Sequence, residues 1–106
     1  MLTRKTAIER VKQFALEIKN KGLHLRKVIL FGSYAANKQH RWSDIDVALV
    51  ADEFIGVGFE DVQLFSAINI KKPFMLIETR TYPTSYFKKG DPFIDEIKRT
   101  GIEIAV

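Results

Sequence analysis

The sequence predicts one small α+β (α/β) domain, in which a mixed β-sheet is packed by helices. The chain has 106 residues, of which 46% are apolar, and that length and composition suffice for one domain with a buried core. A helical apolar stripe comes first, and short β-favouring runs then alternate with further helical patterns. The expected order is helix, strand, strand, helix, strand, helix, strand, within a single domain that spans residues 1–106.

The first helix is indicated by its start signal and its periodicity. Thr6–Glu9 has the form of a capping box, a hydroxyl residue followed three positions later by Glu. Apolar residues from Ile8 to Ile18 then recur at intervals of three or four. Gly22 is the expected stop.

Two strands are expected to follow the first helix. Residues 27–31 form a continuous β-favouring run, typical of a strand buried on both faces. The run ends at Gly32-Ser33, where a short helical turn can begin, and residues 37–43 form a polar loop. Residues 44–51 make the second strand, in which the side chains of Asp44 and Asp46 point to the same face.

The second half of the chain is assigned from periodicity and from glycine and proline punctuation. The remaining elements are expected to be a loop at residues 54–58, a helix at 60–68, a strand at 74–79, a turn or short helix at 83–87, a helix at 92–100 and a short edge strand near the end.

Composition excludes several classes of site. The chain has no cysteine, which excludes disulfides, thiolate zinc sites and cysteine nucleophiles. Its two histidines, His24 and His40, are too few for a histidine-rich metal site. No run of 18 apolar residues is present and the first residues lead into an amphipathic helix, so we expect a cytoplasmic protein without a signal peptide or membrane span.

The net charge of +4 is unevenly distributed. The first 27 residues hold eight basic and two acidic side chains, a local balance of +6. This segment has two interpretations: a surface for nucleic acid or an acidic partner, or a solvated helix face. We favour the solvated face.

The residues that indicate chemistry lie where the first predicted strand ends and where the second one begins. Asp44 and Asp46 carry two carboxylates on one face of a strand, which suits oxygen-preferring cations such as Mg²⁺. Gly32-Ser33 ends the preceding strand, where a turn directs amide donors at an anion. Lys38 and Arg41, in the next loop, can neutralise phosphate charge.

The order Gly32-Ser33, polar loop, Asp44-Ile45-Asp46 resembles the signature of the DNA-polymerase-beta-like nucleotidyltransferases, and in particular their minimal nucleotidyltransferase (MNT) branch. The resemblance implies the nucleotidyltransferase (polymerase-beta-like) fold over most of the chain. It also implies that the aspartates bind catalytic Mg²⁺, as a pair of ions, and that the Gly-Ser turn holds the triphosphate of a nucleotide, ATP by expectation.

A third carboxylate is implied by the same resemblance, and Glu78 near the end of the predicted third strand is the candidate. Family members commonly continue Gly-Ser-x-Ala with a basic residue and a glycine, whereas this chain has Ala36-Asn37. Lys38 is the candidate replacement for that cation. The implied reaction transfers a nucleoside monophosphate, AMP by expectation, to a hydroxyl acceptor.

A binding role is the alternative hypothesis. MNT proteins often resemble the antitoxin of a toxin–antitoxin pair whose partner is a helical HEPN ribonuclease. Such a partner, or a homo-oligomer, would use exposed aromatic side chains, although these residues could equally belong to the core. The candidates are Tyr34, Trp42, Tyr82, Tyr86 and Phe87. Direct binding of nucleic acid ranks lowest, because the basic residues are not interleaved with aromatic ones.

Overall fold

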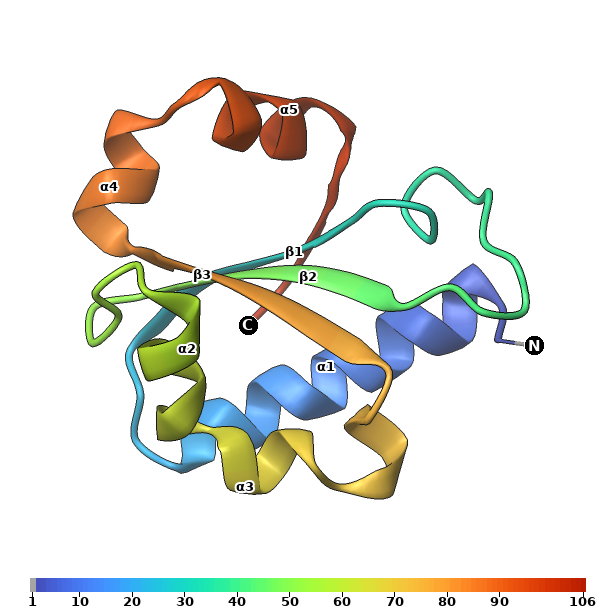
Figure 1. The fold of residues 1–106 in the computed structure, drawn as a ribbon, viewed down its shortest axis with the longest axis horizontal. Helices are drawn as coiled ribbons and strands as arrows, with labels where there is room; N and C mark the ends of the chain where they lie inside the picture. The colour runs from blue at the N-terminus through green and yellow to red at the C-terminus, as the bar shows by residue number, and fades with distance from the viewer. Residues whose placement is uncertain (1) are drawn as a thin grey trace.

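Four strands form one mixed sheet at the centre of the computed structural model, which describes residues 2–106 (Figure 1). The strands are β1 (Leu25–Phe31), β2 (Ile45–Ala51), β3 (Ile77–Pro83) and β4 (Ile102–Ile104). Their order across the sheet is β3-β2-β1-β4. Strand β1 runs antiparallel to β2 and β4, and β2 runs parallel to β3, which confirms the predicted mixed sheet.

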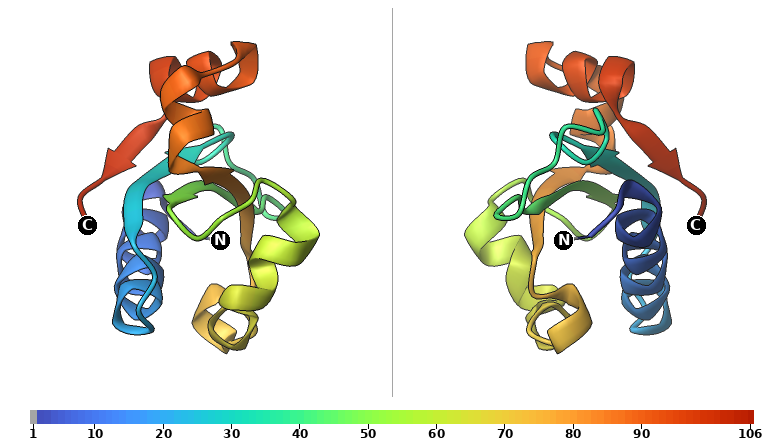
Figure 2. Two further views of the ribbon diagram at one scale, coloured as in Figure 1. Left: turned by 90° about the vertical axis from the view of Figure 1, so that its left-hand side faces the viewer. Right: turned by 90° about the vertical axis from the view of Figure 1, so that its right-hand side faces the viewer.

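Helices cover both faces of this sheet (Figure 2). One face carries α1 and α3, and the other carries α4 and α5. No helix within residues 2–106 is long and apolar enough to cross a membrane. The helical segments are α1 (Arg4–Asn20), α2 (Gly58–Asp61), η1 (Val62–Leu64), α3 (Ser66–Asn69), η2 (Lys72–Phe74), α4 (Thr84–Lys89) and α5 (Pro92–Thr100).

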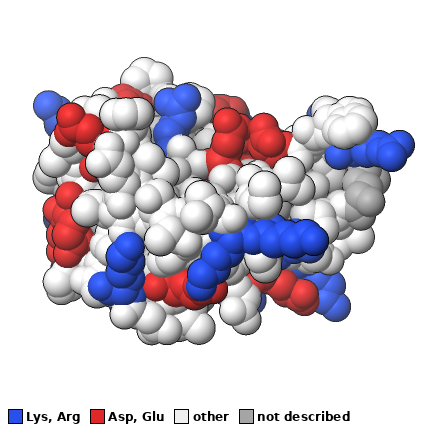
Figure 3. Space-filling model, turned by 60° about the horizontal axis from the view of Figure 1, so that its bottom comes forward, with Lys and Arg blue, Asp and Glu red and all other residues white. Residues whose placement is uncertain are grey.

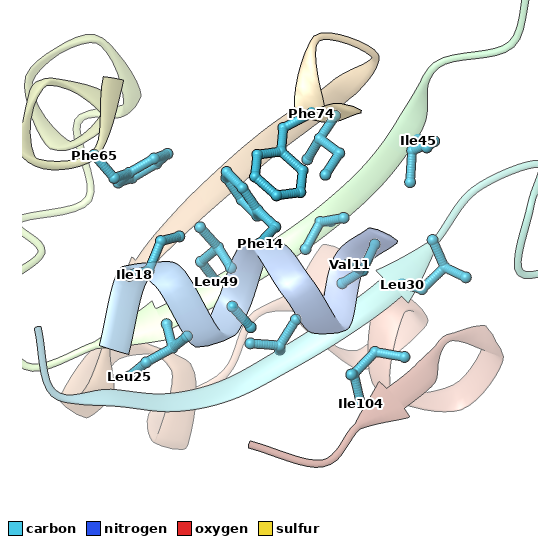
Figure 4. Packing of buried hydrophobic residues seen from close by; sticks show 14 of the residues in the cluster. Val11, Phe14, Ile18, Leu25, Leu30, Ile45, Leu49, Phe65, Phe74 and Ile104 are labelled. Atoms are coloured by element: carbon cyan, nitrogen blue, oxygen red, sulfur yellow. The ribbon is translucent and has the colours of Figure 1, made fainter. Parts of the chain in front are cut away.

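The larger core lies between α1 and the sheet (Figure 4). Phe14 of α1 is fully buried and touches two further rings, Phe65 at 5.9 Å and Phe74 at 5.4 Å between centroids. Aromatic pairs of this kind add to the stabilisation from apolar burial. The cluster therefore fixes α1 and the segment before β3 against the same face of the sheet.

The smaller core lies on the opposite face, beneath α4 and α5. Ala48 and Val50 of β2 point into it, whereas Val47 and Leu49 point into the larger core. Residue Ile29 of β1 also belongs to the smaller core, so β1 and β2 are buried on both faces, and the continuous apolar run of β1 predicts this for the first of them. These two strands therefore form a rigid support for the turn after β1 and for the residues at the start of β2.

Two helix predictions need correction. Helix α1 begins at Arg4, because Thr3 rather than Thr6 is the N-cap: Oγ1 of Thr3 accepts the N–H of Thr6 at 3.1 Å. The helix predicted over residues 60–68 is wrong as a single helix, since it divides into α2, η1 and α3. Phe65 breaks it with φ −137° and ψ 13°, a conformation in which its ring enters the larger core.

The third strand begins three residues later than predicted and extends further. Phe74 belongs to η2 and is buried against Phe14, so its apolar character reflects core packing and not a strand. Strand β3 continues to Pro83, which suits an edge strand because proline has no N–H to donate. The helix predicted over 92–100 and the short edge strand after it are confirmed as α5 and β4.

The junction of α5 and β4 has no room for a side chain at Gly101. A Cβ there would lie 2.6 Å from the carbonyl oxygen of Ile97 and 3.0 Å from that of Leu30. Gly101→Ala is expected to lower the free energy of unfolding by about 1–3 kcal/mol, since backbone must shift to admit the methyl group. Urea denaturation measures this change.

Gly58→Ala is the matched control, because a Cβ at Gly58 meets nothing within 4 Å. Its unfolding free energy should stay within about 0.5 kcal/mol of the parent protein. Equal effects of the two substitutions would contradict the packing described at Gly101.

Candidate active site

Strands β2 and β3 begin side by side at one end of the sheet (Figure 1), and the acidic residues singled out from the sequence lie at or next to these strand starts. Because these strands are parallel and in register, Asp46 lies directly beside Glu78. Residues paired in this way project to the same face, here the face that carries α4 and α5. Asp44 precedes β2 by one residue and shares the alternation of Asp46.

Gly32 makes room for the carboxylate of Asp46. It follows β1, whose last residue, Phe31, pairs with Asp46 across the antiparallel ladder. Its φ is +75°, and a Cβ at this position would overlap Oδ2 of Asp46 and lie 3.1 Å from its Cγ. Only glycine satisfies both the backbone conformation and the space that the carboxylate occupies.

The segment after β1 is a series of tight turns, as predicted. The N–H groups of residues 36–38 donate to the carbonyl oxygens of residues 32–34 at 2.8–3.2 Å, and Lys38 thereby meets the backbone of Ser33. Tyr34 and Ala35 are buried and anchor the segment to the larger core. Within residues 2–106, no protein oxygen accepts the N–H groups of residues 33–35. Successive amides of this kind can bind an anion.

The carboxylates raise one another's affinity for protons. Burial, followed by the charge of Asp44, raises the pKa of Asp46, and the Arg80 cation partly opposes this. Hydrogen bonding with Asp44, followed by the Asp44 charge, raises the pKa of Glu78. Like charges gathered at one edge favour either a proton or a cation.

The donor set fits a hard cation, although its side chains are not yet arranged around one. Three carboxylates supply the oxygen ligands that Mg²⁺ prefers. Among residues 2–106, no three His, Cys, Asp or Glu side chains already form a set that could hold a metal ion. The side chains of Asp44 and Glu78 are exposed, whereas the backbone of Gly32 lies against the carboxylate of Asp46.

Sequence reasoning missed Arg80. It lines a cleft of about 220 Å³ together with Asp46, Glu78, Phe31 and Thr79. The predicted strand ended at Thr79, so the alternation that places Arg80 on the face of Glu78 was not extended to it. Because β3 continues to Pro83, the spacing of two residues between Glu78 and Arg80 is enough to place both side chains on one face.

The other polar candidates lie outside the cleft. The side chain of Lys38 is exposed, and the guanidinium of Arg41 lies 5.4 Å from the ring centroid of Trp42. His24 contacts Glu53 at 2.6 Å, beyond the opposite end of the strands, and His40 is exposed in the loop. Neither histidine lines the cleft.

The face that carries α1 does not form a continuous basic surface (Figure 3). Lys and Arg side chains alternate there with Asp and Glu, and Lys71 pairs with Glu17 of α1 at 2.5 Å. A binder of nucleic acid needs a clustered positive surface. On the side that Figure 3 shows, acidic side chains therefore interrupt the basic ones, which favours the solvated face over a nucleic-acid surface.

This combination of fold and acidic edge agrees with comparisons to known proteins. The family model described as nucleotidyltransferase domain matches residues 11–104. The chain therefore belongs to the nucleotidyltransferase domain family. A crystal structure from Sulfolobus solfataricus, provisionally assigned as a nucleotidyltransferase, has a similar fold with a TM-score of 0.67 and 19% identity. The alignment covers 94% of this chain and 80% of that one. No curated protein matches the sequence.

Gly32→Ala is expected to displace the Asp46 carboxylate and to abolish binding of Mg²⁺, as measured by isothermal titration calorimetry. Gly22→Ala is the control for backbone strain, because Gly22 also has a positive φ, +108°, but open space around its Cβ position. That variant should lose about 1 kcal/mol of stability and keep its affinity for Mg²⁺. Loss of metal binding in both variants would contradict the role of space at Gly32.

Asp46→Asn is expected to stabilise the metal-free protein at neutral pH. A raised pKa means that the folded state binds protons more tightly than the unfolded chain, so stability falls as pH rises from 3.8 through the folded pKa of Asp46. Neutralising this carboxylate removes that loss. Thermal melting in EDTA across pH 4–8 measures this effect. At pH values above the folded pKa of Asp46, the variant should have a higher Tm than the parent protein, and a lower Tm would contradict the electrostatic account.

Proposed function

We propose that this chain is a Mg²⁺-dependent nucleotidyltransferase, formed as a single minimal domain over residues 1–106 and acting in the cytoplasm. It would transfer a nucleoside monophosphate, AMP from ATP, to a hydroxyl acceptor. The observation that carries the proposal is the arrangement around Asp46. This residue pairs in register with Glu78, lies two residues from Asp44 on the same face of the strand, and packs against the Gly32 backbone. Family membership supports the general reaction class.

Two groups of residues would bind the substrate and its metal ions. Gly32, Ser33 and Lys38 would hold the triphosphate, because the turn offers amides that no protein oxygen within residues 2–106 accepts, together with one exposed cation. Asp44, Asp46 and Glu78 would hold Mg²⁺, as a pair of ions. When bound, such ions neutralise charge on the attacking and leaving oxygens of an in-line displacement.

The protein's own part in the reaction is positioning and proton transfer. The acceptor hydroxyl attacks the α-phosphorus, forming an O–P bond, while the bond from that phosphorus to the bridging oxygen of pyrophosphate breaks. Glu78 would complete the metal site or, as the alternative role, take the hydroxyl proton. Arg80, beside Asp46, adds positive charge to the wall of the cleft.

A transfer assay tests the proposal directly. With α-labelled ATP, Mg²⁺ and a candidate acceptor protein, the acceptor should become labelled, and Asp46→Asn should reduce the rate roughly a hundredfold or more. Asp95→Asn, on the exposed surface of α5, changes the same charge elsewhere and should leave the rate unchanged. Labelling that survives Asp46→Asn, or the absence of Mg²⁺-dependent nucleotide binding, would contradict the proposal.

A binding role for a protein partner is favoured by a separate observation. Three large apolar side chains, Ile70, Met75 and Leu76, are 75%, 67% and 45% exposed before β3. Ile70 and Met75 line one surface cavity of about 350 Å³. Apolar groups gathered on a surface often mark an interface. A helical HEPN-type ribonuclease, restrained as the toxin of a toxin–antitoxin pair, would be the partner, and a second copy of this chain is the simplest competitor.

The aromatic residues considered from the sequence contribute less to such an interface. Tyr34, Tyr82 and Phe87 are buried, whereas Trp42 and Tyr86 are 79% and 44% exposed. Two of the five candidates therefore remain available on the surface.

Co-expression with a HEPN protein tests the partner. The double variant Ile70→Asp, Met75→Asp should abolish co-elution on size-exclusion chromatography, because charges would be desolvated at the interface. Leu16→Asp, at a 54% exposed position on α1, should not. Co-elution of the double variant would contradict this docking surface, and a smaller particle for the isolated protein on the same substitution would indicate a homo-oligomer instead.

A further inference from the structure

A second cavity adjoins the carboxylate cleft on the same face of the sheet. It has a volume of about 370 Å³ and is lined chiefly by Arg80, Tyr82, Tyr86, Asp91 and Phe93. Arg80 lines both the cleft and this cavity, so the two hollows share one wall. Glu78, Arg80 and Tyr82 follow one another along one face of β3, about 6.5 Å apart at each step. A ligand bound at Glu78 would therefore reach the second cavity by passing Arg80 along β3.

The lining of this cavity consists largely of aromatic rings in fixed positions. The rings of Tyr82 and Tyr86 are parallel within 5°, with centroids 6.2 Å apart. Phe93 packs edge-on against Phe31 at 5.9 Å and carries the Arg80 guanidinium 4.4 Å above its ring. Tyr86 and Phe93 are nevertheless 44% and 42% exposed, so part of each ring remains open to a planar ligand.

Asp91 adds a hydrogen-bond acceptor to the lining. Its Oδ2 accepts from the Tyr86 hydroxyl at 2.6 Å, and its Oδ1 accepts the N–H of Ile94 at 2.8 Å. These bonds lower the pKa of Asp91, the Tyr86 hydroxyl most of all, so the group is an ionised acceptor at neutral pH. Each carboxylate oxygen retains a further lone pair for an N–H donor.

We infer that this cavity receives the nucleobase of the nucleoside triphosphate, held against Tyr86 and Phe93, with Asp91 accepting a hydrogen bond from an amino group of the base. The inference rests on the proposed function, which places the phosphates at the carboxylate cleft. A planar ring matches the aromatic lining. An ionised acceptor favours bases that carry an amino group, such as adenine, over uracil, whose ring carries no amino group.

Isothermal titration calorimetry of the full chain in Mg²⁺ separates the base from the phosphates, with ATP and inorganic tripolyphosphate as the two ligands. Tyr86→Ala and Phe93→Ala should each weaken ATP binding roughly tenfold, through loss of ring contact, and leave tripolyphosphate affinity within about twofold. Phe59→Ala is the matched control: this phenylalanine is 79% exposed and lines neither the cleft nor the cavity. Circular dichroism verifies that each variant is folded.

Asp91→Asn tests the choice of base. Asparagine is an equally good N-cap, so α5 keeps its start. The preference of the parent protein for ATP over UTP should shrink in this variant. Three results would overturn the cavity assignment alone. Tyr86→Ala and Phe93→Ala could weaken the binding of ATP and tripolyphosphate equally, they could weaken neither, or the parent protein could show no preference for ATP over tripolyphosphate. If the parent protein binds neither ligand, the proposed function fails together with it.

Discussion

The close approach of the Gly32 backbone to the Asp46 carboxylate is the contact on which the rest of the site depends. The carboxylate fits there because Gly32 has no Cβ and can adopt a positive φ. The same contact positions the carboxylate above the turn and beside Glu78 on the neighbouring strand; within residues 2–106, no protein oxygen accepts the amides of residues 33–35 of that turn. The proposed phosphate-binding turn and the proposed cation-binding carboxylates thus lie next to each other.

The two buried cores hold this arrangement against its own electrostatic repulsion. Asp46 lies near the start of β2, and the residues after it in that strand, Val47 to Ala51, are all buried. Burial on both faces prevents the strand from rotating the carboxylate away from its acidic neighbours. The raised pKa values of Asp46 and Glu78 record the cost of that restraint. Like charges held together in this way favour either a proton or a cation.

Much of the fold was predictable because its signals are local. The two-sided burial of β1 follows from its uninterrupted apolar run, and α5 follows from Asp91, Pro92 and Gly101. The segment before β3 was not predictable, because Phe65 and Phe74 serve the core from irregular backbone. Asp46 was recognisable as an acid within an apolar strand. Arg80 depended on the true end of β3, which long-range pairing decides.

The carboxyl pKa values of Asp46 and Glu78 test this account most directly. Side-chain carboxyl-carbon NMR can follow both groups over a pH titration, first in EDTA and then in saturating Mg²⁺. Without metal, both groups should titrate above their ordinary values of 3.8 and 4.5, and Mg²⁺ should lower both pKa values. Ordinary pKa values that do not respond to Mg²⁺ would contradict the claim that these carboxylates form one cation-binding site.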